Sequence, residues 1–262
     1  MSSSGWMCLG YWDDDTTSYE TACEQLALKL IHSTAVDLDR PLAVLDVGCG
    51  NGVSTMLYAD RFPAMTLVGV DISPQQVKTA IEQLHAVGDQ SLSSRVSFSV
   101  ADAVDLSRFD SNSFDIVLAL ECAFHFEARA TFFAEAIRVL RPAGKIALAD
   151  ICAQTKIPLK PAPALMKQLM LSIPDDNLEN MTTYNSRMQA TGFVNSVITP
   201  ITADTFCPFS KFFDRAQHLH FKTGAQPNTA LAAFSWYMCV SKFLMRHTAE
   251  YILAVGTKPS CD

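Results

Sequence analysis

The sequence predicts an α/β protein built on a doubly wound, mostly parallel sheet, and two observations carry this prediction. Strand-like apolar runs alternate with helix-like segments over about 150 residues, which is the pattern of a parallel sheet covered by helices on both faces. A glycine-rich turn at residues 48–52 follows the first of these runs, and ligands of such sheets bind at the carboxyl ends of the strands.

Seven strands are expected, at residues 42–47, 66–70, 96–100, 114–120, 145–151, 194–201 and 251–256. One helix begins after Ser73, because Pro74 suits the first helical position and Gln76 the third. The other expected helices cover residues 17–32, 53–61, 127–140, 164–171, 182–191, 206–220 and 229–246. The last two interrupt the run of strands and are predicted to form a helical lid over the ligand edge of the sheet.

The whole chain, residues 1–262, is expected to form one domain, because no repeat or Pro/Gly-rich linker divides it. Within that domain, residues 1–35 are predicted to form an N-terminal helical cap. Residues from about 202 to 248 are predicted to form the helical insertion.

Composition narrows the possible partners and locations. Apolar residues make up 49% of the chain and charged residues 18%, which is enough apolar material for a packed core. The net charge of −7, without a run of Lys or Arg, argues against nucleic acid. No signal peptide and no bilayer-spanning run is recognised, so we expect a cytoplasmic protein without a membrane span. The eight cysteines lack metal-site spacing and are expected to be reduced thiols.

The glycine-rich turn predicts a nucleoside-binding site. Residues 44–52 read VLDVGCGNG, and glycines there let backbone N–H groups and a helix N-terminus approach a ligand closely. Asp71 ends the second strand, 19 residues after Gly52, where a carboxylate can accept hydrogen bonds from both ribose hydroxyls. Asp46 precedes the turn within the first strand, where it could order water or pair with an ammonium group.

A nicotinamide enzyme is the first alternative to weigh. Its G-x-G-x-x-G pattern requires glycine or alanine at the position of Val53, whereas this chain has G-x-G-x-G. The spacing therefore makes an NAD(P) oxidoreductase the less favoured hypothesis.

Four motifs in order carry a family resemblance: the glycine turn, residues 70–76 (VDISPQQ), residues 101–103 (ADA), and residues 120–126 (LECAFHF) with RVLRP at 138–142. The chain resembles the class I S-adenosylmethionine-dependent methyltransferases. It is nearest the small-molecule branch with ubiquinone/menaquinone, tocopherol and antibiotic sugar O-methyltransferases. The resemblance implies a Rossmann-like fold, S-adenosylmethionine as cofactor and S-adenosylhomocysteine as product.

The resemblance also implies roles for single residues. Asp71 would hold the ribose, and Asp102 would accept a hydrogen bond from the adenine amino group. Glu121 would lie beside the methionine end of the cofactor. Cys49 is interpreted as a small residue in a tight turn and not as a nucleophile. The full set expected around the cofactor is Tyr11, Asp46, Gly48, Cys49, Gly50, Gly52, Asp71, Ile72, Gln76, Ala101, Asp102, Ala103, Glu121 and Cys122.

On the acceptor side, His125 and Asp150 follow or end neighbouring strands and are predicted to act as a general-base pair. The alternative is that His125 only packs on the cofactor. Related sugar O-methyltransferases often have two consecutive histidines here, whereas this chain has Phe124-His125. Oxygen is the favoured acceptor atom, and nitrogen or carbon stays open. No metal is expected, because Asp150 is not followed by the Asn of magnesium-dependent relatives.

The insertion predicts the nature of the acceptor. Its many aromatic side chains suggest an apolar-walled pocket for a small apolar or aromatic metabolite. They are Phe206, Phe209, Phe212, Phe213, Phe221, Phe234, Trp236 and Tyr237. A monomer or a homodimer is expected. Another possibility is a methyltransferase-fold protein that binds the cofactor but catalyses a cyclisation or only regulates.

Overall fold

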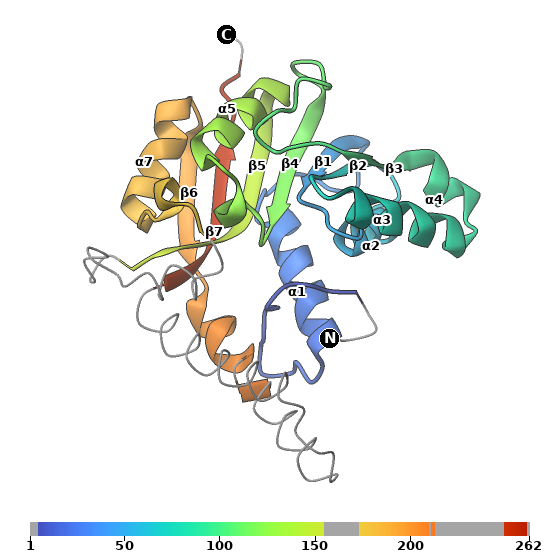
Figure 1. The fold of residues 1–262 in the computed structure, drawn as a ribbon, viewed down its shortest axis with the longest axis horizontal. Helices are drawn as coiled ribbons and strands as arrows, with labels where there is room; N and C mark the ends of the chain where they lie inside the picture. The colour runs from blue at the N-terminus through green and yellow to red at the C-terminus, as the bar shows by residue number, and fades with distance from the viewer. Residues whose placement is uncertain (1–4, 155–172, 210, 213–248, 261–262) are drawn as a thin grey trace.

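A seven-stranded sheet forms the centre of the molecule (Figure 1). The computed structural model describes residues 5–154, 173–209, 211–212 and 249–260. The strands are β1 (Leu42–Val47), β2 (Met65–Asp71), β3 (Val96–Val100), β4 (Phe114–Leu120), β5 (Leu140–Ala153), β6 (Val194–Pro200) and β7 (Ala249–Thr257). Their order is β3-β2-β1-β4-β5-β7-β6, and only the pairings made by β7 are antiparallel. The predicted doubly wound, mostly parallel α/β sheet is confirmed.

Helices cover both faces of this sheet, as Figure 1 shows. One face packs against α1 (Tyr19–His32), α2 (Val53–Arg61) and α3 (Pro74–Val87), and the other against α5 (Arg129–Val139) and α7 (Met181–Thr191). The alternation of side chains along β1 serves both layers, because Val44 faces the first and Leu45 the second. The core therefore lies in two layers, one on each side of the sheet.

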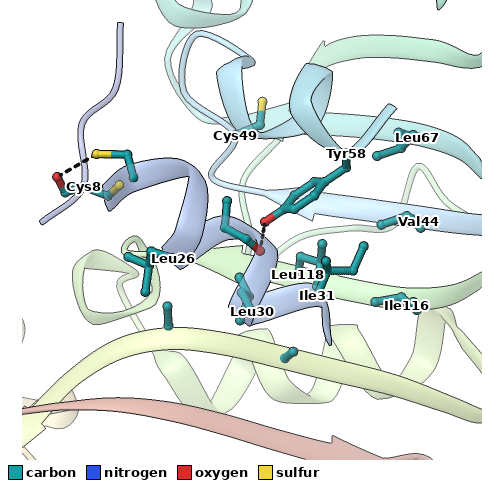
Figure 2. Packing of buried hydrophobic residues seen from close by; sticks show 14 of the residues in the cluster. Cys8, Leu26, Leu30, Ile31, Val44, Cys49, Tyr58, Leu67, Ile116 and Leu118 are labelled. Carbon is teal, nitrogen blue, oxygen red and sulfur yellow. Dashed lines mark hydrogen bonds between the residues drawn. The ribbon is translucent and has the colours of Figure 1, made fainter. Parts of the chain in front are cut away.

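The first layer is drawn in Figure 2, where apolar side chains of α1 meet those of β1 and β4. Leu26, Leu30 and Ile31 of α1 are fully buried. Tyr58 of α2 lies in the same layer and donates its hydroxyl hydrogen bond to the carbonyl of Ala27 at 3.2 Å. Truncating one such leucine to alanine is expected to lower the free energy of unfolding by about 2–5 kcal/mol.

The helix predicted after Ser73 is present, and its capping is as expected: the Ser73 hydroxyl accepts from the backbone N–H of Gln76. The short helix α4 (Gln90–Arg95) was not expected, because its polar sequence has no apolar periodicity. The Asp89 carboxylate caps it by accepting from the N–H groups of Ser91 and Leu92. The helices predicted at 164–171 and 229–246 lie outside the described residues, as does most of 206–220.

The strand order creates a crevice site at the centre of the sheet. From β1 the chain moves to β2 and β3 on one side, and then returns to β4 and β5 on the other. Loops after β1 and β4 therefore diverge, and the crevice between them is where open parallel sheets bind ligands. Within the described ranges, no helix is long and apolar enough to cross a membrane.

Candidate functional site

A cavity of about 380 Å³ lies at this crevice. Its walls come from four segments: the glycine turn after β1, the end of β2 with the start of α3, the loop after β4, and the N-terminal residues 5–8. Seven of the fourteen residues expected around the cofactor line it, namely Gly48, Cys49, Gly50, Asp71, Gln76, Glu121 and Cys122. His125, expected on the acceptor side, also lines it.

The glycine turn needs glycine for two physical reasons. Gly48 and Gly50 have φ of +69° and +56°, in the left-handed region that disfavours side chains. A Cβ at Gly48 would also lie 2.5 Å from the sulfur of Cys122, and one at Gly50 would lie 2.7 Å from Cε of Met7. Glycine at both positions therefore lets Cys122 and Met7 approach the turn closely at the wall of the cavity.

Gly52 has a different role from the other two glycines. It is outside the cavity lining, and a Cβ there would lie 2.6 Å from the ring of Phe98 in β3. Glycine at this position lets α2 pack closely against the sheet.

Asp71 is held in place by the turn that it faces. Its Oδ2 accepts from the N–H of Gly50 and its Oδ1 from the N–H of Ser73, each at 2.9 Å. A carboxylate has about four acceptor sites, so each oxygen can take another hydrogen bond. Ile72, next in sequence, is 66% exposed, and its apolar surface at this edge suits the face of an adenine ring. Both features fit a bound nucleoside.

Asp46 is buried beneath the turn. Its Oδ2 accepts from the hydroxyls of Ser54 at 3.0 Å and Thr55 at 2.6 Å, which ties β1 to the first turn of α2. Its Oδ1 is buried without a hydrogen-bond partner among the described residues. Burial raises the pKa of Asp46 to about 6, partly offset by the two hydroxyls. An unpaired buried oxygen next to the cavity is compatible with a bound polar ligand or water.

Glu121 begins the loop after β4 in a conformation that is unusual for a non-glycine residue, with φ of +52°. Such strain is often stored at functional sites. Its Oε1 accepts from the N–H of Leu9 at 2.6 Å and from the hydroxyl of Tyr251 at 2.5 Å. Burial raises the pKa of Glu121 to about 7, and the two hydrogen bonds act against this shift. The carboxylate can therefore exchange its proton near neutral pH while lining the cavity.

Cys122 faces the same cavity as a neutral thiol. Burial raises its pKa well above the usual value, and its Sγ donates to the carbonyl of Val47 at 3.1 Å. Cys49, in the turn itself, likewise has a raised pKa because it is buried. Neither thiol is available as a thiolate nucleophile.

His125 ends the one-turn 3₁₀ helix η1 (Ala123–His125) and stands at the rim of the cavity. Its ring lies 4.2 Å from that of Phe124, measured between centroids. Partial burial lowers the pKa of His125, while the negative charge of Asp150 acts in the opposite direction. The imidazole is therefore neutral at pH 7 and able to accept a proton.

Asp150 is placed differently from the sequence-based expectation of a direct pair with His125. It is fully buried in β5, with Oδ2 3.0 Å from Nε of Arg129 and accepting from the hydroxyl of Tyr184 at 2.9 Å. Its Oδ1 accepts from the N–H of Ile151. The described residues contain no hydrogen bond between Asp150 and His125, because the carboxylate faces the cation of α5.

The remaining expected residues lie outside the cavity lining. Tyr11 packs under Lys29, whose Nζ is 4.2 Å from the ring centroid. Asp102 follows β3 and accepts from the N–H of Val104 in a tight turn at the same sheet edge. The full group is Tyr11, Asp46, Gly52, Ile72, Ala101, Asp102 and Ala103. No cluster of ligands that could hold a metal is found in the described part of the chain.

The N-terminal segment is the part of the site that the sequence did not reveal. Residues 5–8 line the cavity, and the side-chain amides of Asn51 and Gln76 donate to the Gly5 carbonyl and the Met7 sulfur. Farther along, the backbone N–H of Trp12 donates to the carbonyl of Asp204 at 2.8 Å. These contacts are individual hydrogen bonds without periodicity, so no pattern marks them. Also missed were Asn51, Val53, Ser54, Ser73 and Leu120.

Comparison with known proteins agrees with this geometry. A family described as a methyltransferase domain matches residues 45–148. Erythromycin 3''-O-methyltransferase of Saccharopolyspora erythraea is 30% identical over 213 residues, which cover 79% of this chain and 68% of that protein.

Two solved structures share the fold. The [4+2]-cyclase SpnF has a TM-score of 0.76 at 22% identity and covers 98% of this chain and 89% of its own. Geranyl diphosphate C-methyltransferase from Streptomyces coelicolor, in complex with S-adenosyl-L-homocysteine, has a TM-score of 0.73 at 16% identity and covers 97% and 92%. The matched family, the relative and the glycine-turn cavity agree, and the chain belongs to the class I S-adenosylmethionine-dependent methyltransferases.

Proposed function

We propose that this chain transfers a methyl group to an oxygen atom of a small apolar or aromatic metabolite, without a metal ion. The observation that carries the proposal is the composition of one cavity. Two carboxylates, Asp71 and Glu121, line it, and the neutral imidazole of His125 stands at its rim. Similarity to an erythromycin 3''-O-methyltransferase supports a small-molecule acceptor and oxygen as the acceptor atom.

The residues present fit S-adenosylmethionine. Asp71 would hold the ribose hydroxyls with its remaining lone pairs, and Gly48 and Gly50 would allow close approach to the backbone. Glu121 would pair with the methionine ammonium group. Ile72 would cover the adenine ring, and Asp102, flanked by Ala101 and Ala103, would accept from the adenine amino group. When bound, the cofactor supplies an electrophilic methyl group on a positively charged sulfur.

The chain's own residues would align the acceptor and remove its proton. An imidazole nitrogen of His125 accepts the proton of the acceptor hydroxyl as the oxygen gains the methyl group, and later releases the proton to solvent. Residues 5–8 would exclude water from one side of the cavity. Tyr11, Asp46, Gly52 and Gln76 would support the cofactor site, with Cys49 and Cys122 as small neutral neighbours.

Further aspects belong to the same proposal. The aromatic residues of the insertion other than Phe206, which is buried against Tyr251 in the core, would line the acceptor pocket; those at 213 and beyond lie outside the described residues. A cytoplasmic monomer or homodimer that does not bind nucleic acid agrees with the net charge of −7 and with six free thiols among the described cysteines.

The test has a binding arm and a product arm. S-adenosylmethionine and S-adenosylhomocysteine, but not NADH, should bind in calorimetric titration. In a panel of phenolic, glycosidic and amine acceptors, mass spectrometry should detect a product heavier by one methylene group. His125→Ala should lower kcat by about 10²–10⁴-fold with unchanged S-adenosylhomocysteine affinity, whereas His85→Ala, on α3 outside the cavity lining, should not. An isomerised product would instead indicate a cyclase, and normal turnover of His125→Ala would remove the base from the mechanism.

A further inference from the structure

One side chain from outside the turn that carries His125 is hydrogen-bonded on both sides of this histidine. Asn177, in the 3₁₀ helix η2 (Asp175–Asn177), donates from Nδ2 to the carbonyls of Phe124 at 3.2 Å and Phe126 at 2.7 Å. These are the carbonyls of the residues immediately before and after His125. One amide group therefore holds both ends of the peptide segment that presents the imidazole.

The other end of Asn177 is attached to the start of α5. Its Oδ1 accepts from the N–H of Arg129 at 3.1 Å, and its backbone carbonyl accepts from Nη1 of the same arginine at 3.0 Å. Asn177 is fully buried. The first turn of α5 has no side-chain cap of its own, since its N-cap residue is Ala128. Asn177 thus links η1 and α5.

Arg129 anchors this link in the core. It is buried and paired with Asp150, at 3.0 Å from Nε to Oδ2, and with Glu179, at 2.9 Å from Nη1 to Oε1. Buried networks of this kind hold their members rigidly when nearly every polar group is paired. The His125 turn is therefore connected to β5 through Asn177, Arg129 and Asp150.

Other contacts also support the turn, since the Sγ of Cys122 donates to the carbonyl of Val47 and the ring of Phe126 packs on that of Phe132. The internal hydrogen bonds of the turn run from the N–H of His125 to the carbonyl of Cys122 and from the N–H of Phe126 to the carbonyl of Ala123. The start of the turn is tied to the sheet by the N–H of Glu121, which donates to the carbonyl of Ala149, whereas the carbonyls on either side of His125 are held by Asn177. Catalytic geometry tolerates little displacement, since about 1 Å can cost about 10²-fold in rate.

We propose that Asn177 is a positioning residue that holds His125 at the rim of the cavity for methyl transfer. This inference rests on the proposed role of His125 as the base. Asp150 then acts on His125 through Arg129 and Asn177 instead of by direct contact.

The experiment compares Asn177→Ala and Asn177→Asp with a matched asparagine. Asn177→Asp keeps the shape and the acceptor for Arg129 but loses the amide donors. Asn180→Ala removes the N-cap of α7, where Oδ1 accepts from the N–H groups of Thr182 and Thr183, away from the cavity. Melting temperatures establish that each variant folds.

For both Asn177 variants we expect kcat to fall by about 10- to 100-fold, with S-adenosylhomocysteine affinity within about twofold. Asn180→Ala should lower the melting temperature and leave kcat unchanged. In a double-mutant cycle, Asn177→Ala should add less than about twofold to the loss already caused by His125→Ala. In NMR spectra of histidine-labelled protein, the ring signal of His125 can be assigned by its absence in His125→Ala. Its chemical shift should change in the Asn177 variants and not in Asn180→Ala.

Three outcomes would overturn the inference: wild-type turnover in Asn177→Ala, an undiminished effect of Asn177→Ala in the His125→Ala background, or an unmoved His125 ring signal. If His125→Ala itself turns over normally, the proposed base fails and the catalytic role of Asn177 fails with it. A normal Asn177→Ala beside an impaired His125→Ala overturns the positioning role alone.

Discussion

Two acidic side chains on neighbouring strands of the same sheet, Glu121 after β4 and Asp150 in β5, have opposite surroundings. Glu121 faces the cavity, accepts two hydrogen bonds from neutral donors and has its pKa raised to about 7. Asp150 is fully buried against the guanidinium of Arg129. The first carboxylate can bind a cation or exchange a proton, whereas the second already has a cation, Arg129, as its partner inside the protein.

The comparison shows that the partner decides what a buried carboxylate can do. Asp150, in contact with Arg129 of α5 and Tyr184 of α7, links both helices to β5. Glu121 accepts hydrogen bonds from a tyrosine hydroxyl and a backbone N–H, and neither donor carries a charge that would balance the charge of an ionised carboxylate. The positively charged ammonium group of S-adenosylmethionine would balance the charge of Glu121.

Breaking the ion pair should have the largest effect. Arg129→Met leaves Asp150 and Glu179 buried without their common cation, so the free energy of unfolding should fall by about 3–5 kcal/mol. Urea denaturation measures this change. Arg61→Met is the matched control, because Arg61 is exposed and its carboxylate partners are 3.9 Å away, a contact worth at most about 1 kcal/mol. Equal stabilities of the two variants would mean that Asp150 does not depend on Arg129.

Removing the charge of Glu121 should weaken cofactor binding without unfolding the protein. Glu121→Gln replaces a charge-assisted contact, and at pH 8 the affinity for S-adenosylmethionine should fall by about 10- to 100-fold, equivalent to about 1.5–3 kcal/mol. At pH 5.5 the wild-type residue is protonated, so the ratio of the two affinities should approach one. Calorimetry at both pH values measures it, with the exposed Glu127→Gln as control. A ratio independent of pH would assign the ammonium group to another residue.

The sequence predicts the sheet and the glycine turn because both follow from local patterns. The turn requires Gly48 and Gly50 for reasons that a motif records, and Asp71 occupies the end of a recognisable strand. Ser73 and Pro74 mark the start of α3 for the same reason. Such features depend on neighbours in the sequence.

The residues that hold Asp150 and the His125 turn in place lie far from them in the sequence. Arg129 is 21 residues from Asp150, and Asn177 is 52 residues from His125, with no motif at either position. The cation of a buried pair is recognised only once folding has brought it to the carboxylate. The N-terminal residues 5–8 escaped prediction similarly, since single hydrogen bonds from Asn51 and Gln76 leave no pattern.

The raised pKa of Glu121 also predicts a pH effect on stability. Its folded pKa of about 7 lies above the unfolded value of about 4.3, so the fold favours the protonated form. This contribution is present below pH 4 and is lost as the pH rises through 7. Relative to Glu121→Gln, the wild type should lose at most about 3 kcal/mol between pH 5 and pH 8 in urea denaturation. The raised pKa of Asp46 affects both proteins equally, so its contribution cancels in the comparison. If the difference in free energy of unfolding between the two proteins did not change with pH, the raised pKa of Glu121 would be contradicted.

The smallest change tests what holds Glu121. Tyr251→Phe removes one hydrogen bond that lowers the pKa of Glu121, so that pKa should rise and the ionised fraction at pH 7 should fall. Cofactor affinity should drop by about three- to tenfold at pH 7 and recover relative to wild type at pH 9. Expressing the result as a ratio to wild type cancels the titration of the ligand's own amino group. Tyr184→Phe removes the equivalent hydroxyl from Asp150 and should leave this ratio flat, because Asp150 is held by Arg129 and does not line the cavity. A flat ratio for Tyr251→Phe as well would show that Glu121 and Asp150 are not distinguished by their partners.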